Sequence, residues 1–259
     1  MEKVIRFKLE GFDPFIDFIK AYAIICVLIG HTVPHPDYYG YGLWAGMQVP
    51  LFVLVQSFHS LKKEYSHFSL KKILWRLFVP FLLLQLLLLT FLLFLSDTES
   101  SYYYNEFLVG GGYGPGSYFP WVYLQIAIIL PLIHRFINKG SKFLNFILAI
   151  IICEGFEILQ SIIDLPEDTH RLLAIRYFFL IYFGWLWVKE GIIINWKTTL
   201  LSLLSLFSII YFEYFSVDDE PFFYQTAWSI HRWPCYYYVA IWGGYLLWSL
   251  FNVLNTSVH

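Results

Sequence analysis

The chain has 259 residues, of which 58% are hydrophobic, 22% aromatic and only 14% charged, and its formal net charge is -2. Soluble domains carry roughly 25% charged residues, so this composition, with a mean hydropathy of +0.59, excludes an ordinary water-soluble domain. The near-neutral charge gives no support to nucleic-acid binding. We therefore expect one integral membrane domain over residues 1–259, with the lipid bilayer as the solvent for its apolar surface.

Apolar segments long enough to cross a bilayer recur along the chain. A spanning helix needs about 20 mostly apolar residues, and only helices or closed barrels satisfy their backbone in lipid. The pattern predicts an all-α, polytopic bundle of about eight transmembrane helices. The expected spans are Pro14–Val33, Tyr41–Leu61, Ile73–Leu95, Ser117–Asn138, Phe143–Ile163, Leu172–Val188, Thr198–Phe215 and Pro234–Leu254.

The connections between these spans alternate between basic and acidic. Since Lys and Arg are retained on the cytoplasmic side of a membrane, the N-terminus and the basic connections are expected in the cytoplasm. Eight spans then return the C-terminus to the same side. No secretory signal pattern follows the basic start, so the first span should stay attached. The basic residues of the N-terminus and of these basic connections are Lys3, Arg6, Lys8, Lys62, Lys63, Lys71, Lys72, Arg135, Lys139, Lys142, Lys189 and Lys197.

Two compositional features have simple interpretations. The glycine-rich stretch Gly110–Gly116 lacks the lysine of a phosphate-binding loop, so it is interpreted as a flexible loop on the outer side. Cys26, Cys153 and Cys235 are far apart in the sequence and form no zinc or disulfide pattern. They are interpreted as small core residues, and no metal site is expected.

The first span carries ionisable residues, which are costly inside a membrane and point to function. Lys20 and His31 are eleven residues apart, which in an α-helix is three turns plus about 20°, so both lie on one face about 16 Å apart along the axis. Asp17 is three residues before Lys20 and shares that face. An imidazole suits general base catalysis. The alternatives are an interfacial Asp17–Lys20 ion pair and a hydrogen-bonded packing histidine.

The pattern Asp17-x-x-Lys20 followed by Gly30-His31 resembles the first helix of membrane-bound acyltransferase family 3, in which an arginine precedes the histidine. Lys20 replaces that arginine, and Gln56-Ser57 replaces the family's usual Ser-Gly. The family usually has about ten spans, so this chain would lack the last ones. The resemblance covers most of the chain, through the segments Val49–Phe58, Lys71–Pro80, Tyr118–Pro131 and Arg176–Gly184.

This resemblance implies an O-acyltransferase that takes an acyl group, expected to be acetyl, from cytoplasmic acetyl-CoA. The acceptor would be a hydroxyl of a bacterial surface glycan or glycolipid precursor at the plasma membrane. His31 would act as the base, Lys20 and Arg76 would position the donor, and Asp17 would complete the catalytic group. Cations bind the phosphates of coenzyme A, although the positive-inside bias explains the same charges without a ligand. The expected donor-binding cations are Arg76, Lys72, Lys71 and Arg135.

Glu154 and Glu157 lie three residues apart in the fifth span, so they share a helix face, and Arg176 of the next span could pair with Glu157. We expect these side chains to bind the acceptor sugar or to orient His31, and a buried structural ion pair is the alternative. Two other functions remain open. Intramembrane charges could line the pathway of a glycan or lipid transporter, or the chain could be an inactive acyltransferase-like subunit.

Overall fold

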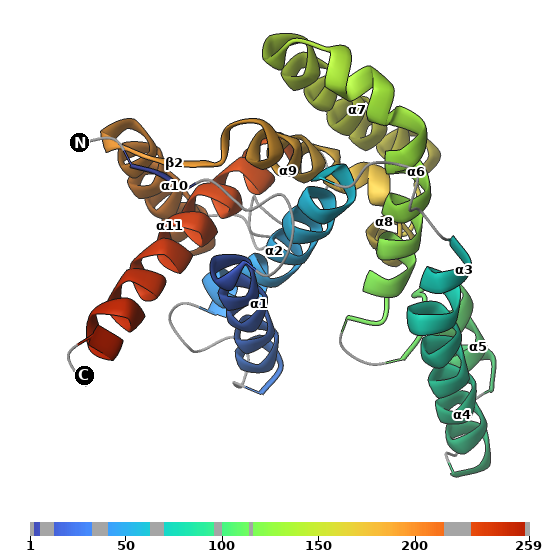
Figure 1. Cartoon of the computed structure of the whole chain (residues 1–259). Coiled ribbons are helices and arrows are strands. Elements are labelled where there is room, and N and C mark those ends of the chain that lie inside the picture. The colour runs from blue at the N-terminus through green and yellow to red at the C-terminus, as the bar shows by residue number, and fades with distance from the viewer. Residues whose placement is uncertain are drawn as a thin grey trace.

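The chain folds into a bundle of helices, as its hydropathy pattern predicts (Figure 1). The computed structural model describes residues 3–5, 13–32, 41–62, 70–95, 100–113, 116–214 and 229–256. Each of the eight predicted spans corresponds to a helical segment of this described part. The helices are α1 (Pro14–Thr32), α2 (Tyr41–Lys62), α3 (Leu70–Ile73), α4 (Val79–Leu95), α5 (Ser100–Leu108), α6 (Phe119–Lys139), α7 (Lys142–Ile163), α8 (Glu167–Arg171), α9 (Phe178–Glu190), α10 (Trp196–Tyr214) and α11 (Ser229–Thr256), with the π-helical turn η2 (Leu74–Phe78) and the 3₁₀ turn η3 (Ala174–Tyr177).

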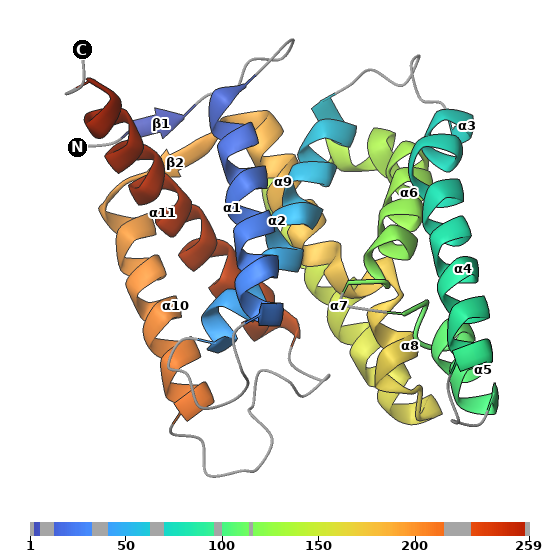
Figure 2. The same cartoon turned by 90° about the horizontal axis from the view of Figure 1, so that it is seen from below.

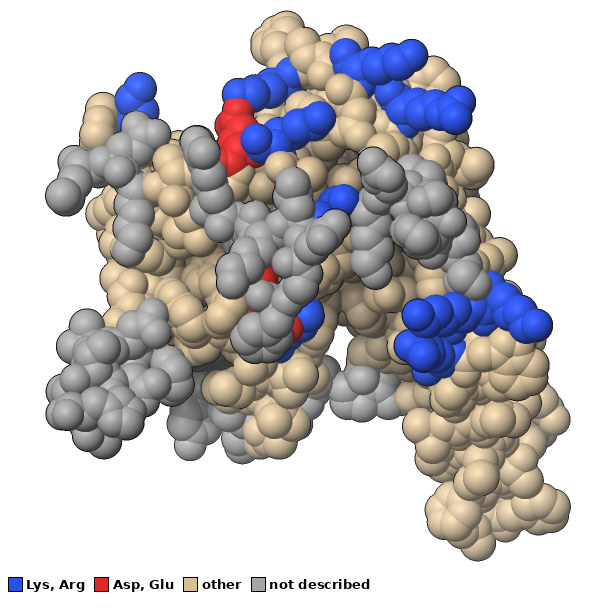
Figure 3. All heavy atoms as spheres, viewed as in Figure 1, with Lys and Arg blue, Asp and Glu red and all other residues tan. Residues whose placement is uncertain are grey.

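The helices stand with their ends gathered in two layers (Figure 2). One layer holds the start of α1, the end of α2, α3, and the junction of α6 with α7, and the opposite layer holds α5 and α8. The first layer also holds a short antiparallel strand pair, β1 (Lys3–Ile5) and β2 (Ile192–Ile194), in which Val4 is opposite Ile193. Lysine and arginine dominate this layer (Figure 3), as the alternation of basic and acidic connections predicts. We call this first layer the basic end.

Much of the outer surface of the bundle is apolar. Large side chains such as Phe94, Phe136 and Ile162 are mostly exposed, which a water-soluble protein would not tolerate over so many positions. Within the described residues, three helical stretches are long and apolar enough to cross a membrane: Leu70–Leu95, Phe119–Lys139 and Lys142–Gln160. These exposed apolar side chains are the surface that lipid would cover.

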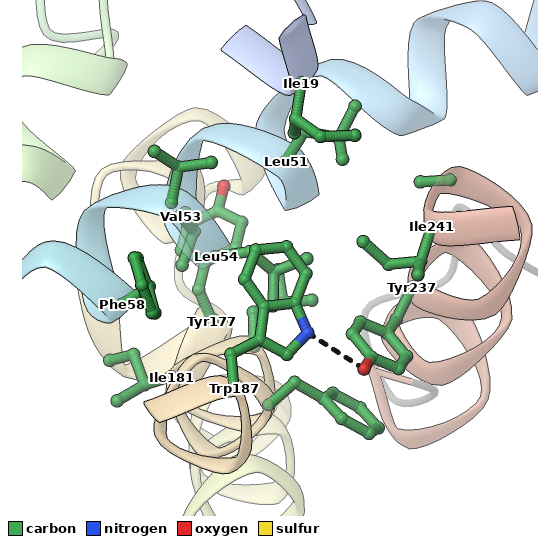
Figure 4. Packing of buried hydrophobic residues seen from close by; sticks show 14 of the residues in the cluster. Ile19, Leu51, Val53, Leu54, Phe58, Tyr177, Ile181, Trp187, Tyr237 and Ile241 are labelled. Atoms are coloured by element: carbon green, nitrogen blue, oxygen red, sulfur yellow. Dashed lines mark hydrogen bonds between the residues drawn. The ribbon is translucent and has the colours of Figure 1, made fainter. Parts of the chain in front are cut away.

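Helix α9 lies at the centre of the bundle, where α2 crosses it at close range (Figure 4). Its side chains are buried on several faces, among them Phe179, Leu180 and Trp187. Gly184 makes the close approach possible, because a Cβ atom there would lie 2.6 Å from Ser57 Cβ and 3.1 Å from Leu54 O. Small residues allow two helices in a membrane to pack backbone to backbone, so Gly184 sets the distance between α2 and α9.

Helix α11 completes this core through aromatic contacts with α9. Trp187 donates a hydrogen bond from Nε1 to the hydroxyl of Tyr237 at 3.0 Å (Figure 4). The ring of Tyr237 also stacks on Phe183, with their centroids 3.8 Å apart and an angle of 9° between the planes. The buried indole and phenol thus satisfy each other's polar groups while they fill the core. Cys26 and Cys153 are buried as predicted, and the three cysteines are free.

We predict that Gly184→Ala lowers the stability of the bundle. The added methyl group must displace Ser57 or the α2 backbone, and overpacking of this kind typically costs about 1–3 kcal/mol. The thermal midpoint of the protein in lipid nanodiscs, followed by tryptophan fluorescence, should fall. Gly155→Ala in α7 is the matched control, because its Cβ meets nothing within 4 Å and alanine favours a helix. Equal midpoints for the two variants would contradict the proposed role of Gly184.

Candidate active site

The polar residues of α1 begin at its first turn. Asp13 caps the helix, because its Oδ1 accepts hydrogen bonds from the backbone N–H groups of Phe15 at 3.1 Å and Ile16 at 3.3 Å. Lys20 Nζ then lies 2.7 Å from Asp17 Oδ1, and the two side chains are 40% and 41% exposed. This confirms the proximity expected from their spacing. The pair is half-buried, so its net contribution to stability is small.

Lys20 lies at the edge of the core-facing side of α1, between its buried and its exposed faces. The buried residues of the helix include Ile16, Ile19 and Ala23, whereas Ile24, one turn after Lys20, is exposed. The helix is unbroken from Pro14 to Thr32. The prediction that Lys20 and His31 share one face requires such a continuous helix. The side chain of His31 lies outside the described part of the chain, and its catalytic role stays a prediction.

The predicted donor-binding cations lie at the basic end of the bundle. Lys71, Lys72 and Arg76 are exposed on α3 and η2, both of which pack against α6, and Arg135 is exposed near the end of α6. Figure 3 shows basic side chains gathered over α3 and over the ends of α6 and α7. The structure therefore places these four residues at one end of the molecule, on neighbouring elements.

Arg76 lies within the π-helical turn η2. The turn is closed by a hydrogen bond from the N–H of Val79 to the carbonyl of Leu74, five residues earlier. Pro80 follows directly; a proline lacks an N–H and its ring clashes with the carbonyl four residues before it, which here belongs to Arg76. The wider turn accommodates this proline. Such π-turns are frequent at functional sites.

A second group of ionisable residues is buried toward the opposite end. Glu157 of α7 and His170 of α8 are 1% and 0% exposed, and Glu157 Oε2 lies 3.5 Å from His170 Nε2. The imidazole also stacks on Phe156, with centroids 5.5 Å apart and an interplanar angle of 22°. Arg176 of η3 is buried nearby on an element that contacts both α7 and α8, whereas Glu154 is only half-buried.

From the sequence, Arg176 could pair with Glu157, and this stays a prediction. The structure brings His170 to within 3.5 Å of the same carboxylate. His170 was not among the predicted site residues. Its position in an acidic connection gave no indication that it would fold back onto α7. Figure 1 shows α2 and α9 between α1 and α7, so the residues of α1 and the Glu157 group occupy separate parts of the bundle. Substrate binding by Glu154, Glu157 and Arg176 stays a prediction.

Residues 110–113 of the glycine-rich stretch are hydrogen-bonded to side chains of neighbouring elements. Gln85 of α4 is buried and binds the backbone of Tyr113 twice, since Oε1 accepts from the N–H at 2.6 Å and Nε2 donates to the carbonyl at 3.1 Å. Trp121 Nε1 donates to the carbonyl of Gly111 at 2.7 Å, and the Ser117 hydroxyl donates to that of Gly112 at 3.0 Å. Residues 110–113 are thus non-helical, as interpreted, and side chains of α4 and α6 and Ser117 bind their backbone.

A second glutamine holds another irregular segment in the same way. Gln125 Nε2 of α6 donates to the carbonyl of Leu172 at 2.6 Å, and its Oε1 accepts from the N–H of Ala174 at 3.0 Å. The two irregular segments touch, because a Cβ on Gly111 would lie 2.3 Å from Leu172 Cδ2. The side-chain amides of α4 and α6 thus satisfy the backbone of two breaks in helical structure.

The chain was compared with known proteins and families. Residues 13–257 match the acyltransferase 3 family, described as an acyltransferase domain. The chain belongs to this family. No curated protein and no solved structure gives a significant match to this acyltransferase. Family membership implies acyl transfer, and thus an acyl donor, by an integral membrane protein. Across the described residues, no group of His, Cys, Asp and Glu side chains is arranged to hold a metal ion.

We predict that His170→Ala destabilises this acyltransferase strongly. Leaving a buried polar group with one partner fewer typically costs about 1–3 kcal/mol, and more for a charged group, and Glu157 would be left in this state. The measurement is the thermal midpoint in nanodiscs. Ile158→Ala, at the next position of α7 and 60% exposed, is the control and should change it little. A midpoint for His170→Ala equal to that of the control would show that the pair contributes nothing to stability.

Proposed function

We propose that this acyltransferase transfers an acetyl group from acetyl-CoA, bound at the basic end, to a hydroxyl of a surface glycan or its lipid-linked precursor. One observation carries the proposal. Helix α1 begins at the basic end, carries the Asp17–Lys20 pair near its start and runs unbroken to the turn that contains His31. A single rigid element thus connects a cation on the side suited to coenzyme A with a titratable residue on the other side.

The donor would bind first at the basic end. Lys71, Lys72, Arg76 and Arg135 are exposed there on packed elements, so several cations can contact the phosphates of coenzyme A together. Arginine and lysine bind phosphate through charge-assisted hydrogen bonds. This end would face the cytoplasm, where acyl-CoA is made, in agreement with the positive-inside rule.

In the transfer step, the acceptor oxygen attacks the thioester carbonyl carbon while His31 takes the hydroxyl proton. A tetrahedral oxyanion forms at the thioester carbon. Lys20, about 16 Å from His31 along α1, would help to hold the donor. The carbon–sulfur bond then breaks and the proton passes from His31 to the departing thiolate. The products are the O-acetyl ester and free coenzyme A. This direct transfer requires no acyl-serine, which agrees with the lack of a G-x-S-x-G element in the sequence.

We predict that His31→Ala abolishes transfer. Loss of a general base typically lowers the rate about 10²–10⁴-fold. The measurement is transfer of radiolabelled acetyl from acetyl-CoA to glycan in membranes that contain the protein. His134→Ala is the matched control, because this histidine of α6 binds Asn138 on the next turn of the same helix, and its loss should leave transfer intact. Full activity of a folded His31→Ala protein would refute the catalytic role.

We further predict that Lys20→Arg preserves transfer, whereas Lys20→Met lowers it at least about tenfold. The arginine keeps the positive charge and can still pair with Asp17, but methionine removes the charge with little change in volume. Binding of labelled acetyl-CoA should be measured beside transfer. If the chain were a transporter, the purified wild-type protein would neither bind acetyl-CoA nor transfer its acetyl group, and the Lys20 variants would then have no transfer activity to compare.

A further inference from the structure

The two edges of α1 face different neighbours. The helices that pack most closely on α1 are α2 and α11. On one edge, Phe15 and Phe18 contact the ring of Trp248 in α11, with centroids 6.0 and 5.4 Å away. At about 100° per residue, Lys20 lies roughly 160° around the helix from Phe18. Figure 1 shows α11 on one side of α1, and α4 and α6 on the other, so the edge with Lys20 is turned away from α11 and toward α6.

The edge that begins at Lys20 stays open along the helix. The positions of Ile24, Val27 and His31 lie within about 40° of Lys20 around α1. Ile24 is 50% exposed, Val27 is half-buried and the Lys20 side chain is 40% exposed. A ligand can therefore lie lengthwise against this edge, from the half-buried ion pair to the turn that contains His31. We call these four positions the site edge of α1.

The site edge has the length of the pantetheine arm of coenzyme A. Lys20 and the position of His31 are about 16 Å apart along the helix axis. The arm joins its phosphate to its sulfur through about thirteen bonds, and a peptide-like chain extends about 3.6 Å for every three bonds. The extended arm therefore spans roughly 16 Å as well. A phosphate bound by Lys20 would bring the thioester level with His31, and the adenosine end would remain for the cations at the basic end.

Gln56 of α2 offers a hydrogen-bond acceptor on the same side of the bundle. It is 6% exposed, and its Nε2 donates to the carbonyl of Tyr123 in α6 at 2.8 Å. Its Oε1 has no hydrogen-bond partner in the described part of the chain, whereas Gln85 and Gln125 use both ends of their amides. A buried acceptor without a donor is costly. Gln56 and Lys20 are each about 9 Å from the end of their helix at the basic end, so the amide N–H groups of an arm on the site edge would pass at this depth.

We propose that the pantetheine arm of the acyl donor binds along the site edge of α1. Its diphosphate contacts Lys20, and its methylene and dimethyl carbons pack on Ile24 and Val27. One amide N–H of the arm donates to Gln56 Oε1, once the Gln56 side chain turns toward the arm. The identity of the donor rests on the proposed function, which by itself assigns no role to Ile24, Val27 or Gln56.

Binding of acetyl-CoA to the full chain in nanodiscs tests this placement without acyl transfer. Ile24→Trp should raise the Kd for acetyl-CoA at least about tenfold, because the indole occupies the path of the arm. Ile25→Trp is the matched control and should leave the Kd within about twofold of the wild-type value. Ile25 is also 50% exposed, but it lies about 140° from Lys20 around the helix, on the side that lipid covers. Equal Kd values for the two variants would overturn the placement.

Adenosine 3′,5′-bisphosphate, which has the nucleotide of coenzyme A but no arm, separates loss of these contacts from loss of the fold. Ile24→Trp and Gln56→Met should each weaken the binding of acetyl-CoA at least about tenfold and leave the binding of the bisphosphate unchanged. Equal weakening of both ligands, or of neither, would overturn the assignment of that residue. If the wild-type chain binds in this pattern but transfers no acetyl group, the proposed function fails and the placement of the arm stands. Normal transfer with equal binding by the Ile24 and Ile25 variants would refute the placement alone.

Discussion

The contact between α2 and α9 at Gly184 is the constraint on which the rest of the bundle depends. In a membrane, apolar burial does little to drive helices together, so association rests on close packing and interhelical hydrogen bonds. Gly184 lets the backbone of α9 approach Ser57 and Leu54 of α2. Helices α1 and α6 then pack on α2, and α7 packs on α9, while α11 contacts both. The helices that carry the predicted site residues, α1 and α6 on one side and α7 on the other, are therefore positioned through the contact at Gly184.

Glutamine side chains inside the bundle provide the second organising feature. Gln85 and Gln125 each bind the N–H and the carbonyl of an irregular segment, and Gln56 of α2 donates to the carbonyl of Tyr123 in α6 at 2.8 Å. A peptide group without a partner is costly in hydrocarbon. A primary amide offers both a donor and an acceptor, so one side chain can replace the partners that a broken helix has lost. This allows breaks in the helices without exposing their backbone to lipid.

Hydropathy predicted the helices well because lipid leaves the backbone few alternatives. The sequence also predicted the proximity of Asp17 and Lys20, because this depends only on their spacing of three residues in a helix. It missed α5, which is short and mostly polar, and it missed the hydrogen bonds of the glycine turn and the Glu157–His170 contact, which depend on residues farther along the chain. Gln85 within a run of leucines did indicate that a polar partner must exist, but the sequence could not identify Tyr113 as that partner. Similarly, Pro80 indicated an irregular helix without specifying a π-turn.

The strand pair β1–β2 constrains how the chain is made. Val4 is opposite Ile193, so the first strand has no partner until the ribosome has synthesised residues 192–194. Six of the eight helical spans precede those residues and can enter the bilayer before then. The N-terminal segment must meanwhile stay on the side where β2 will emerge, because a strand with unpaired peptide groups cannot cross hydrocarbon later at low cost. The final pairing thus closes the bundle late in biosynthesis and requires both segments to share one side of the membrane.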